Sequence, residues 1–231
     1  MMREIVLDTE TTGFEPTEGH RIVEIGAVEL FNHMPTGRTF HQYINPLRPM
    51  PKEAFEVHGL GDDFLRDKPV FKAIGQAFLD FIEDSTLVIH NAAFDMKFLN
   101  AELGWAGLPN LAANRALDTL LIARKRFPGS PASLDALCRR FGVDNSSREK
   151  HGALLDSEIL AEVYLELVGG RQPDLVLSGR ASERSGTAGM PDWRPRPRSH
   201  PLPPRVTQAE EAAHAAFVAA LGETSVWVKR V

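Results

Sequence analysis

The stretch LDTETTG at residues 7–13 decides how this sequence is interpreted, because it ends an apolar run with two carboxylates. Ile5 and Val6 lie directly before it and are typical of a buried β-strand. Side chains at positions i and i+2 of a strand point to the same face, so Asp8 and Glu10 are expected to project together. Two like charges on one small patch repel each other. The pattern therefore predicts a compensating cation nearby.

The first 170 residues show alternating strand and helix patterns. Three β-rich runs joined by short connections are expected to form neighbouring antiparallel strands, at residues 4–9, 22–30 and 40–44. One further strand pattern follows along the sequence, and the segments before and after it carry apolar residues at helical spacing. We expect that strand at 86–90 and helices at 70–82, 94–103, 117–127, 133–141 and 152–168, with Pro69 opening the first, Ser133 capping the fourth and Gly169 ending the last. This order predicts an α/β fold with a mixed sheet flanked by helices.

Composition narrows the class of protein. With 43% hydrophobic and 25% charged residues in 231, the sequence is typical of a soluble globular protein. No apolar run approaches the roughly 20 residues that span a bilayer, and no signal-peptide core is seen, so we expect a cytoplasmic protein without membrane contact. The net charge of -5 argues against a protein that coats DNA electrostatically. The charge is compatible with a nuclease, because carboxylates can hold cations that then supply the positive charge needed to bind a phosphate. The single Cys138 is expected to be a small core residue.

Two further acids stand where a site is expected. Asp95 closes the run HNAAFD at residues 90–95, where a predicted strand gives way to a helix. Open α/β sheets build their sites at such strand ends. The run HGALLD at residues 151–156 sets His151 near the start of the last helix and Asp156 one turn in, beside the apolar face of that helix.

Four carboxylates and a histidine predict a divalent-metal site, because Mg²⁺ and Mn²⁺ prefer hard oxygen ligands. Each residue also has a plainer interpretation. Asp8 and Glu10 could end a strand in solvent, His151 could be an ordinary surface histidine, and Asp156 could stabilise a helix N-terminus through its dipole. Asp118, in the run ALDTLL, has no partner motif and is expected to be structural.

Taken together, these motifs resemble a known family. The runs LDTETTG, HNAAFD and HGALLD stand in the order and rough spacing of the DEDDh exonucleases, also called DnaQ-like. Four more runs resemble the branch formed by the epsilon subunits of bacterial DNA polymerase III: EIGAVE, AFEVHGL, SLDALCRRFGVDNS and HGALLDSEILAEVYLELVGG. The resemblance covers nearly all of residues 3–170. It implies an RNase H-like fold and proofreading, the 3′-to-5′ removal of nucleotides from a single-stranded or frayed DNA 3′ end.

The resemblance also implies roles for individual residues. Two divalent cations, Mg²⁺ or Mn²⁺, would be held by Asp8, Glu10, Asp95 and Asp156. Asp8 would bridge the two cations, and His151 would be the general base. An imidazole that titrates near pH 6.5 suits that task. We expect His151 to sit on a mobile loop, because residues 146–150 offer no apolar anchor.

Substrate contacts are implied in the same way. Glu53 and His58 would approach the sugar of the terminal nucleotide, while the backbone at Thr11 and the ring of Phe94 would shape the base pocket. His58 could instead stabilise its own loop. The full implied set of substrate-binding residues is Glu10, Thr11, Glu53, His58, Phe94 and Asp156.

The composition changes after Gly170. Residues 171–206 are rich in Pro and Arg and are predicted to be a flexible, basic linker after a domain at 1–170. Thr207 and Glu210 resemble a capping box that opens an Ala-rich helix ending near Gly222. Residues 207–231 are too few to fold alone. They resemble the tail with which epsilon subunits dock on the alpha subunit of DNA polymerase III.

A second partner is suggested within the linker. The run QPDLVL at residues 172–177 resembles the short peptides with which replication proteins bind the sliding clamp, through Gln172, Leu175 and Leu177. The alternative is that these residues belong to a plain linker.

Two other functions stay open at this point. One is an RNA-trimming exonuclease of the same family, which would need neither linker nor docking tail. The other is a mainly structural polymerase subunit whose catalysis is vestigial, although all five catalytic-type residues are present.

Overall fold

A computed structural model describes residues 2–146, 150–169 and 206–221 of the chain. The chain divides into two compact units, Met1–Leu177 and Ser178–Val231. The expected linker lies almost wholly outside the described residues. The boundaries at 170 and 206 therefore stay predictions.

The first unit is built on a five-stranded sheet in the order β3-β2-β1-β4-β5. β1 pairs antiparallel with β2, and β2 with β3, whereas β4 runs parallel to β1 and β5 parallel to β4. The strands are β1 (Arg3–Thr11), β2 (Ile22–Phe31), β3 (Met34–Tyr43), β4 (Thr86–Ile89) and β5 (Ala116–Asp118). The predicted mixed sheet and its three antiparallel neighbours are confirmed.

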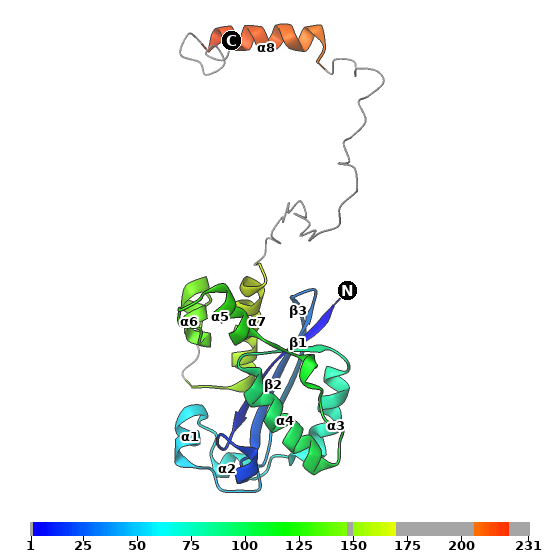
Figure 1. Ribbon diagram of the computed structural model, residues 1–231, viewed down its shortest axis with the longest axis vertical. Coiled ribbons are helices and arrows are strands. Elements are labelled where there is room, and N and C mark those ends of the chain that lie inside the picture. Colours follow the sequence, from blue (N-terminus) through cyan, green and yellow to red (C-terminus); the bar gives the residue numbers. More distant parts are fainter. Residues whose placement is uncertain (1, 147–149, 170–205, 222–231) are drawn as a thin grey trace, which may run out of the picture. The chain divides into compact units, whose positions relative to one another are not determined.

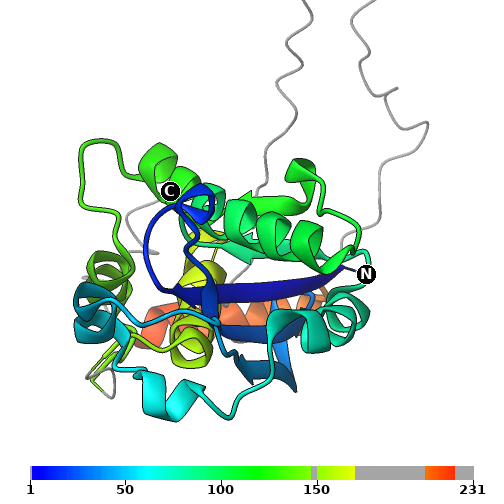
Figure 2. The same cartoon turned by 90° about the horizontal axis from the view of Figure 1, so that it is seen from below.

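Helices cover both faces of this sheet (Figures 1 and 2). They are α1 (Lys52–His58), α2 (Asp62–Leu65), α3 (Phe71–Ile82), α4 (Ala92–Ala106), α5 (Thr119–Arg126), α6 (Leu134–Phe141) and α7 (Ala153–Leu167), with short 3₁₀ turns at Pro16–Glu18 and Ala113–Arg115. The α3 and α4 helices pack on one face with the main core cluster, and α7 packs on the other. The α5 and α6 helices pack against α7. None of the described helices is long and apolar enough to cross a membrane.

The alternation of side chains along β1 assigns each residue to a layer. Ile5 and Leu7 are fully buried in the cluster shared with α3 and α4, whereas Val6 is buried in the cluster shared with α7. Asp8 and Glu10 lie two and four residues after Val6 in the same strand and therefore point to the α7 face. The expectation that the two carboxylates share one face is confirmed.

Several predicted boundaries need correction. The helix predicted at 117–127 starts too early, because residues 117 and 118 belong to β5 and α5 begins only at Thr119. A strand of three residues is too short to show alternation, and its leucine also fits a helical pattern. The α1 and α2 helices were not predicted, since they have only 7 and 4 residues and lack side-chain caps. The α3 helix begins at Phe71, two residues after Pro69.

Other local expectations are confirmed. The Ser133 side chain accepts a hydrogen bond from the backbone of Ala136 and caps α6. Cys138 is fully buried in the cluster between α5, α6 and α7. In the second unit, Thr207 and Glu210 form the predicted capping box of α8 (Gln208–Ala220). No described residue of α8 is buried, so this helix has no core of its own.

Candidate active site

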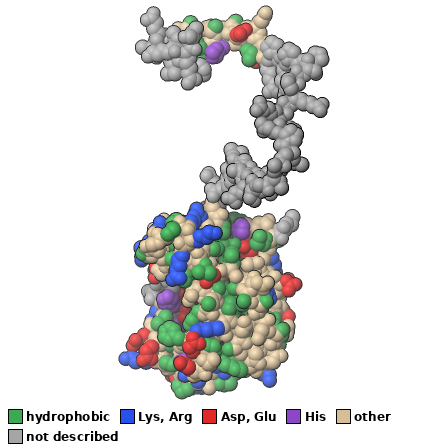
Figure 3. All heavy atoms as spheres, viewed as in Figure 1, with side chains coloured by type: hydrophobic (Ala, Val, Ile, Leu, Met, Phe, Trp, Pro, Cys, Tyr) green, Lys and Arg blue, Asp and Glu red, His purple; other side chains and the backbone are tan. Residues whose placement is uncertain are grey.

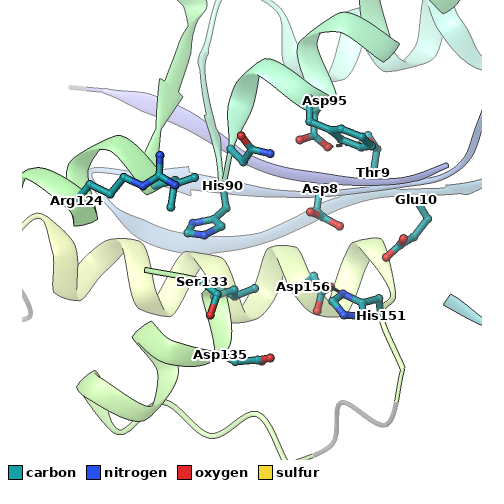
Figure 4. Close-up of a pocket in the computed structure, with 14 residues that line it drawn as sticks. Asp8, Thr9, Glu10, His90, Asp95, Arg124, Ser133, Asp135, His151 and Asp156 are labelled. Carbon is teal, nitrogen blue, oxygen red and sulfur yellow. Dashed lines mark hydrogen bonds and ion pairs between the residues drawn. The ribbon is translucent and has the colours of Figure 1, made fainter. Parts of the chain in front are cut away.

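A cavity of about 590 Å³ lies where β1 and β4 end and where α4 and α7 begin (Figure 4). Its lining includes all five residues to which the sequence assigned chemistry, namely Asp8, Glu10, Asp95, His151 and Asp156. The remaining lining residues are Thr9, His90, Asn91, Phe94, Leu120, Arg124, Ser133, Leu134 and Asp135. Segments far apart in the sequence therefore bring the predicted acids into one cavity.

The close approach of α7 to the sheet places Asp156 near Asp8. Asp8 lies opposite Gly26 in the antiparallel register of β1 and β2. A Cβ atom on Gly26 would come within 2.1 Å of the backbone nitrogen of Leu154 in α7. The hydroxyl of Ser157 donates a hydrogen bond of 2.9 Å to the Gly26 carbonyl. Glycine at this position thus lets the start of α7 rest directly on β2.

Asp95 reaches the cavity from the opposite layer. It lies in the first turn of α4 and is only 3% exposed. The hydroxyl of Thr9, on the α4 side of β1, donates a hydrogen bond of 2.7 Å to Asp95 Oδ1. Burial raises the pKa of Asp95 to about 7, although the hydrogen bond from Thr9 acts in the opposite direction. A carboxylate this deeply buried is costly to ionise unless a cation accompanies it.

Glu10, His151 and Asp156 form the tightest group in the cavity. One side-chain ligand atom from each lies within 4.8 Å of the other two. His151 Nδ1 lies 3.2 Å from Asp156 Oδ2, with the histidine side chain 49% exposed and the aspartate 3%. The backbone N–H of His151 donates to the Val57 carbonyl, which ties this segment to α1. The expected loop around residue 148 falls partly outside the described residues, at 147–149.

The donor set fits a divalent cation. Four carboxyl groups converge from β1, α4 and α7, and hard oxygen ligands of this kind suit Mg²⁺ and Mn²⁺. The buried Asp95 supplies a negative charge that only a cation at this place would offset. Asp8, Glu10, Asp95 and Asp156 could therefore hold metal, with His151 at the exposed edge.

A second cavity of about 450 Å³ adjoins the first and shares Thr9, Glu10 and Phe94 with it. The remaining predicted substrate residues, Thr11, Glu53 and His58, line it as well. Apolar atoms make up most of its surface, through Phe14, Pro51, Ala54, Val57 and Phe94 among others. Its shape and chemistry suit a nucleoside more than a charged group.

His58 makes a contact within its own loop and also lines the second cavity. The backbone N–H of Leu60 donates a 3.0 Å hydrogen bond to His58 Nδ1, as a loop-stabilising histidine requires. The same ring lines the second cavity and is 6% exposed. Burial lowers the pKa of His58, so the ring is neutral near pH 7.

Six polar residues of the first cavity are absent from the predicted site, namely Thr9, His90, Asn91, Arg124, Ser133 and Asp135. His90 opens the run HNAAFD, and this position at the end of a predicted strand was the available signal. Arg124 and Asp135 carry no such signal, since their place depends on how α5 and α6 dock. Asp118 has the structural role that was expected. It accepts hydrogen bonds from the backbone of Leu120 and Ala92, at the starts of α5 and α4.

Comparison with known proteins agrees with these features. The profile of the family described as Exonuclease (RNase_T) matches residues 5–164. The chain is 55% identical over 190 residues to the DNA polymerase III subunit epsilon of Rickettsia felis, covering 81% of this chain and 83% of the relative. It is 48% identical over 194 residues to the subunit of the same name from Escherichia coli K12, covering 80% of each chain.

Solved structures share the fold. Exonuclease X in complex with 5′ overhanging duplex DNA has a TM-score of 0.56 at 24% identity, covering 71% of this chain and 90% of that one. The nuclease domain of 3′hExo, a DEDDh family member bound to rAMP, has a TM-score of 0.60 at 21% identity, covering 72% and 91%. These structures confirm the RNase H-like exonuclease fold. By its matched profile and its relatives, the chain belongs to the exonuclease family and, within it, to the DNA polymerase III epsilon subunits.

Proposed function

We propose that this 3′-5′ exonuclease proofreads DNA by hydrolysing 3′-terminal nucleotides at the acid-lined cavity. Family membership makes the chain a divalent-metal-dependent exonuclease. The observation that carries the proposal is the convergence of Asp8, Glu10, Asp95, Asp156 and His151 on one cavity. The finer assignment is two cations, Mg²⁺ or Mn²⁺, held by the four carboxylates.

When bound, the cations supply a water of lowered pKa and stabilise the attacking and leaving oxygens of the phosphate. The protein contributes rigid placement of the ligands. Asp8 and Glu10 come from the central strand, and Asp156 is held over that strand by the contact of α7 with Gly26. Thr9 fixes the carboxylate of Asp95 through its hydroxyl. Ligands placed in advance in this way need little rearrangement when metal and DNA bind.

His151 is proposed as the general base. Its contact with Asp156 orients the ring at the edge of the acid cluster, and its half-exposed side chain can exchange protons with solvent. An imidazole takes a proton from water efficiently when its pKa lies near the working pH.

The second cavity is proposed to hold the terminal nucleoside. Glu53 and His58 line it where a sugar could be bound, and Phe94 offers a ring to a base. Stacking on an aromatic wall tolerates any base. Preference for mispaired ends then needs no base readout, since a frayed end costs less free energy to unpair.

The first test is metal-dependent degradation of 5′-labelled single-stranded DNA and of the same sequence as RNA. With Mg²⁺ or Mn²⁺ the wild type is expected to shorten DNA stepwise from its 3′ end and RNA only weakly, and EDTA should stop both reactions. His151→Ala is expected to lower the rate on DNA by about 10²–10⁴, the usual contribution of a general base. His214→Ala, which alters an exposed histidine of α8, serves as the matched control.

The same assay separates the two other functions. A clear preference for RNA would favour a trimming exonuclease. Binding of the polymerase subunit without cleavage of either strand would favour a mainly structural subunit.

The tail is proposed to join the enzyme to its partners at the cytoplasmic replisome. The relatives are subunits of DNA polymerase III by name. We assign residues 207–231 to docking on the alpha subunit, supported by α8, which has an ordered capping box but no buried residue of its own. Gln172, Leu175 and Leu177, assigned to the sliding clamp, lie outside the described residues. A flexible tether between the two units would keep the exonuclease at high effective concentration near the DNA end.

Two variants test these partner assignments and control for each other. Ending the chain after residue 206 is expected to abolish binding to purified alpha subunit and to leave clamp binding intact. Replacing Gln172, Leu175 and Leu177 by alanine should do the reverse. Both variants should keep their activity on free single-stranded DNA. Binding is measured by size-exclusion chromatography, and undiminished alpha binding by the shortened chain would refute the docking assignment.

A further inference from the structure

The first cavity extends well beyond the acid cluster. Figure 4 shows Asp8, Glu10 and Asp156 toward one side of the view and Arg124 at the other, with His90 between them. This far end is lined by α5 and α6, and nothing in the proposed chemistry uses it.

Arg124 is the one Lys or Arg among the described residues that line this cavity. It lies one helical turn after Leu120 on α5, so both side chains face the cavity, while its neighbour Lys125 does not line it. Arg124 is exposed, and none of the described carboxylates forms an ion pair with it. Its guanidinium is thus available to a phosphate, for which the planar, forked group is well suited.

His90 is the other basic residue at this end, but its ring nitrogens contact groups of the protein itself. Its Nδ1 lies 2.9 Å from the hydroxyl of Thr119, and burial lowers the pKa of His90 while a hydrogen bond to the backbone of Ala132 opposes that effect. A neutral ring held between two protein groups adds no charge for an anion. Asp135, on the α6 side, accepts a hydrogen bond from the neutral amide of Asn145 and keeps its negative charge. The cationic side chain among the described lining residues at this end is that of Arg124, on α5.

The path of the DNA strand follows from the two adjoining cavities. The proposed nucleoside cavity adjoins the first cavity at Thr9, Glu10 and Phe94, which line both. None of the α5 and α6 residues that line the first cavity lines the second, so the nucleoside cavity lies away from the α5 end. With the terminal nucleoside there and the scissile phosphate at the acid cluster, the remaining strand must leave through the α5 end. In Figure 3, Lys and Arg side chains gather over the part of the first unit that holds α5 and α6.

We propose that the α5 end of the cavity is a subsite for the nucleotides just upstream of the scissile bond, in which Arg124 binds a backbone phosphate. This inference rests on the proposed function. A phosphate contact positions the strand without reading its sequence, as a proofreading enzyme requires. The contact exists only for a substrate that is longer than one nucleotide.

The experiment compares an oligonucleotide with a substrate that lacks the upstream strand. Steady-state kcat/KM is measured for full-length wild type, Arg124→Ala and Lys125→Ala on a single-stranded DNA and on the p-nitrophenyl ester of thymidine 5′-monophosphate. The ratio of kcat/KM on DNA to that on the ester is expected to fall about tenfold in Arg124→Ala, mainly through KM. It should stay within about twofold in Lys125→Ala. The salt dependence of binding to DNA should weaken by about one phosphate contact in Arg124→Ala.

A substrate scan identifies the contact directly. Neutral methylphosphonate linkages are placed one at a time at the three positions upstream of the scissile bond. At one position the difference between wild type and Arg124→Ala should disappear, since the charge is already gone. An unchanged ratio in Arg124→Ala, or a tenfold difference that survives at every position, would overturn the inference. Wild type that cleaves neither DNA nor ester would instead refute the proposed function.

Discussion

Replacing Asp95 with asparagine is expected to lower exonuclease activity by about a thousandfold and yet to stabilise the metal-free protein above pH 7. Activity falls because a proposed metal ligand is lost, and such an ion contributes several kcal/mol to the transition state. Stability rises because asparagine keeps the shape of a side chain that is 3% exposed and removes its buried charge. The amide oxygen can still accept the hydrogen bond from Thr9.

The sign of the pH dependence follows from proton uptake. The unfolded chain releases the Asp95 proton near pH 4, whereas burial raises the pKa in the folded protein to about 7. Between these values the folded state binds more protons, so the stability of the wild type falls as the pH rises. Above pH 7 the full cost is present, roughly 4 kcal/mol for a shift of this size. The asparagine variant lacks this cost.

Thermal melting in EDTA measures the effect. At pH 8 the variant is expected to melt roughly 8–16 °C above the wild type, and the gap should close as the pH is lowered toward 4. Adding Mn²⁺ should raise the melting temperature of the wild type more than that of the variant, because the cation offsets the charge of Asp95. Asp67→Asn, at an exposed carboxylate, is the control and should change neither property. A variant that melts below the wild type at pH 8 in EDTA would contradict this account.

The second large effect is expected from Gly26→Ala, a change of one methyl group outside the cavity lining. The new Cβ would lie 2.1–2.3 Å from backbone atoms of Ala153 and Leu154, which cannot turn aside as a flexible side chain could. The start of α7 must therefore move away from β2. Overpacking of this kind costs about 3 kcal/mol or more when backbone has to shift.

Activity should fall further than stability alone explains. Moving α7 weakens the Ser157 hydrogen bond to Gly26 and displaces Asp156 from its place near Asp8. A misplacement of about 1 Å can cost roughly a hundredfold in rate. Chemical denaturation gives the free energy of unfolding, and kcat is measured at a temperature where the variant is fully folded. Gly104→Ala, on the exposed side of α4, should be neutral or slightly stabilising, because its new Cβ would meet only Asn110 Oδ1, at an ordinary contact distance of 3.9 Å. Full kcat in the folded Gly26→Ala variant would show that α7 does not position the site.

The acid cluster could be predicted from the sequence because strand geometry and local motifs place its members. Asp8 and Glu10 are two residues apart in a strand, so their common face needs no tertiary information. Asp95 and Asp156 each lie in the first turn of a helix, and such a start can be read from local signals. The prediction that all four acids form one metal site follows from their residue types and their places at strand ends and helix starts, and the family resemblance then implies the role of each.

The rest of the site could not be derived from local signals. Arg124 faces the cavity only because α5 docks against α7, and its own run of basic residues resembles an ordinary solvated helix end. The three-residue β5 and the short α1 and α2 owe their form to neighbouring elements. The second cavity likewise depends on where α1 sits relative to the end of β1.

The two faces of β1 determine at which stage of folding nuclease activity can appear. Asp8 and Glu10 face α7, while Asp95 belongs to the opposite layer, so the cavity closes only after both layers have docked on the same strand. The layer that contains α7 is also the last part of the nuclease unit to be synthesised. A nascent chain that has not reached residue 151 carries Asp8, Glu10 and Asp95 but lacks His151 and Asp156. Under the proposed assignments, such a chain cannot hydrolyse DNA, and activity appears only when α7 docks on the sheet.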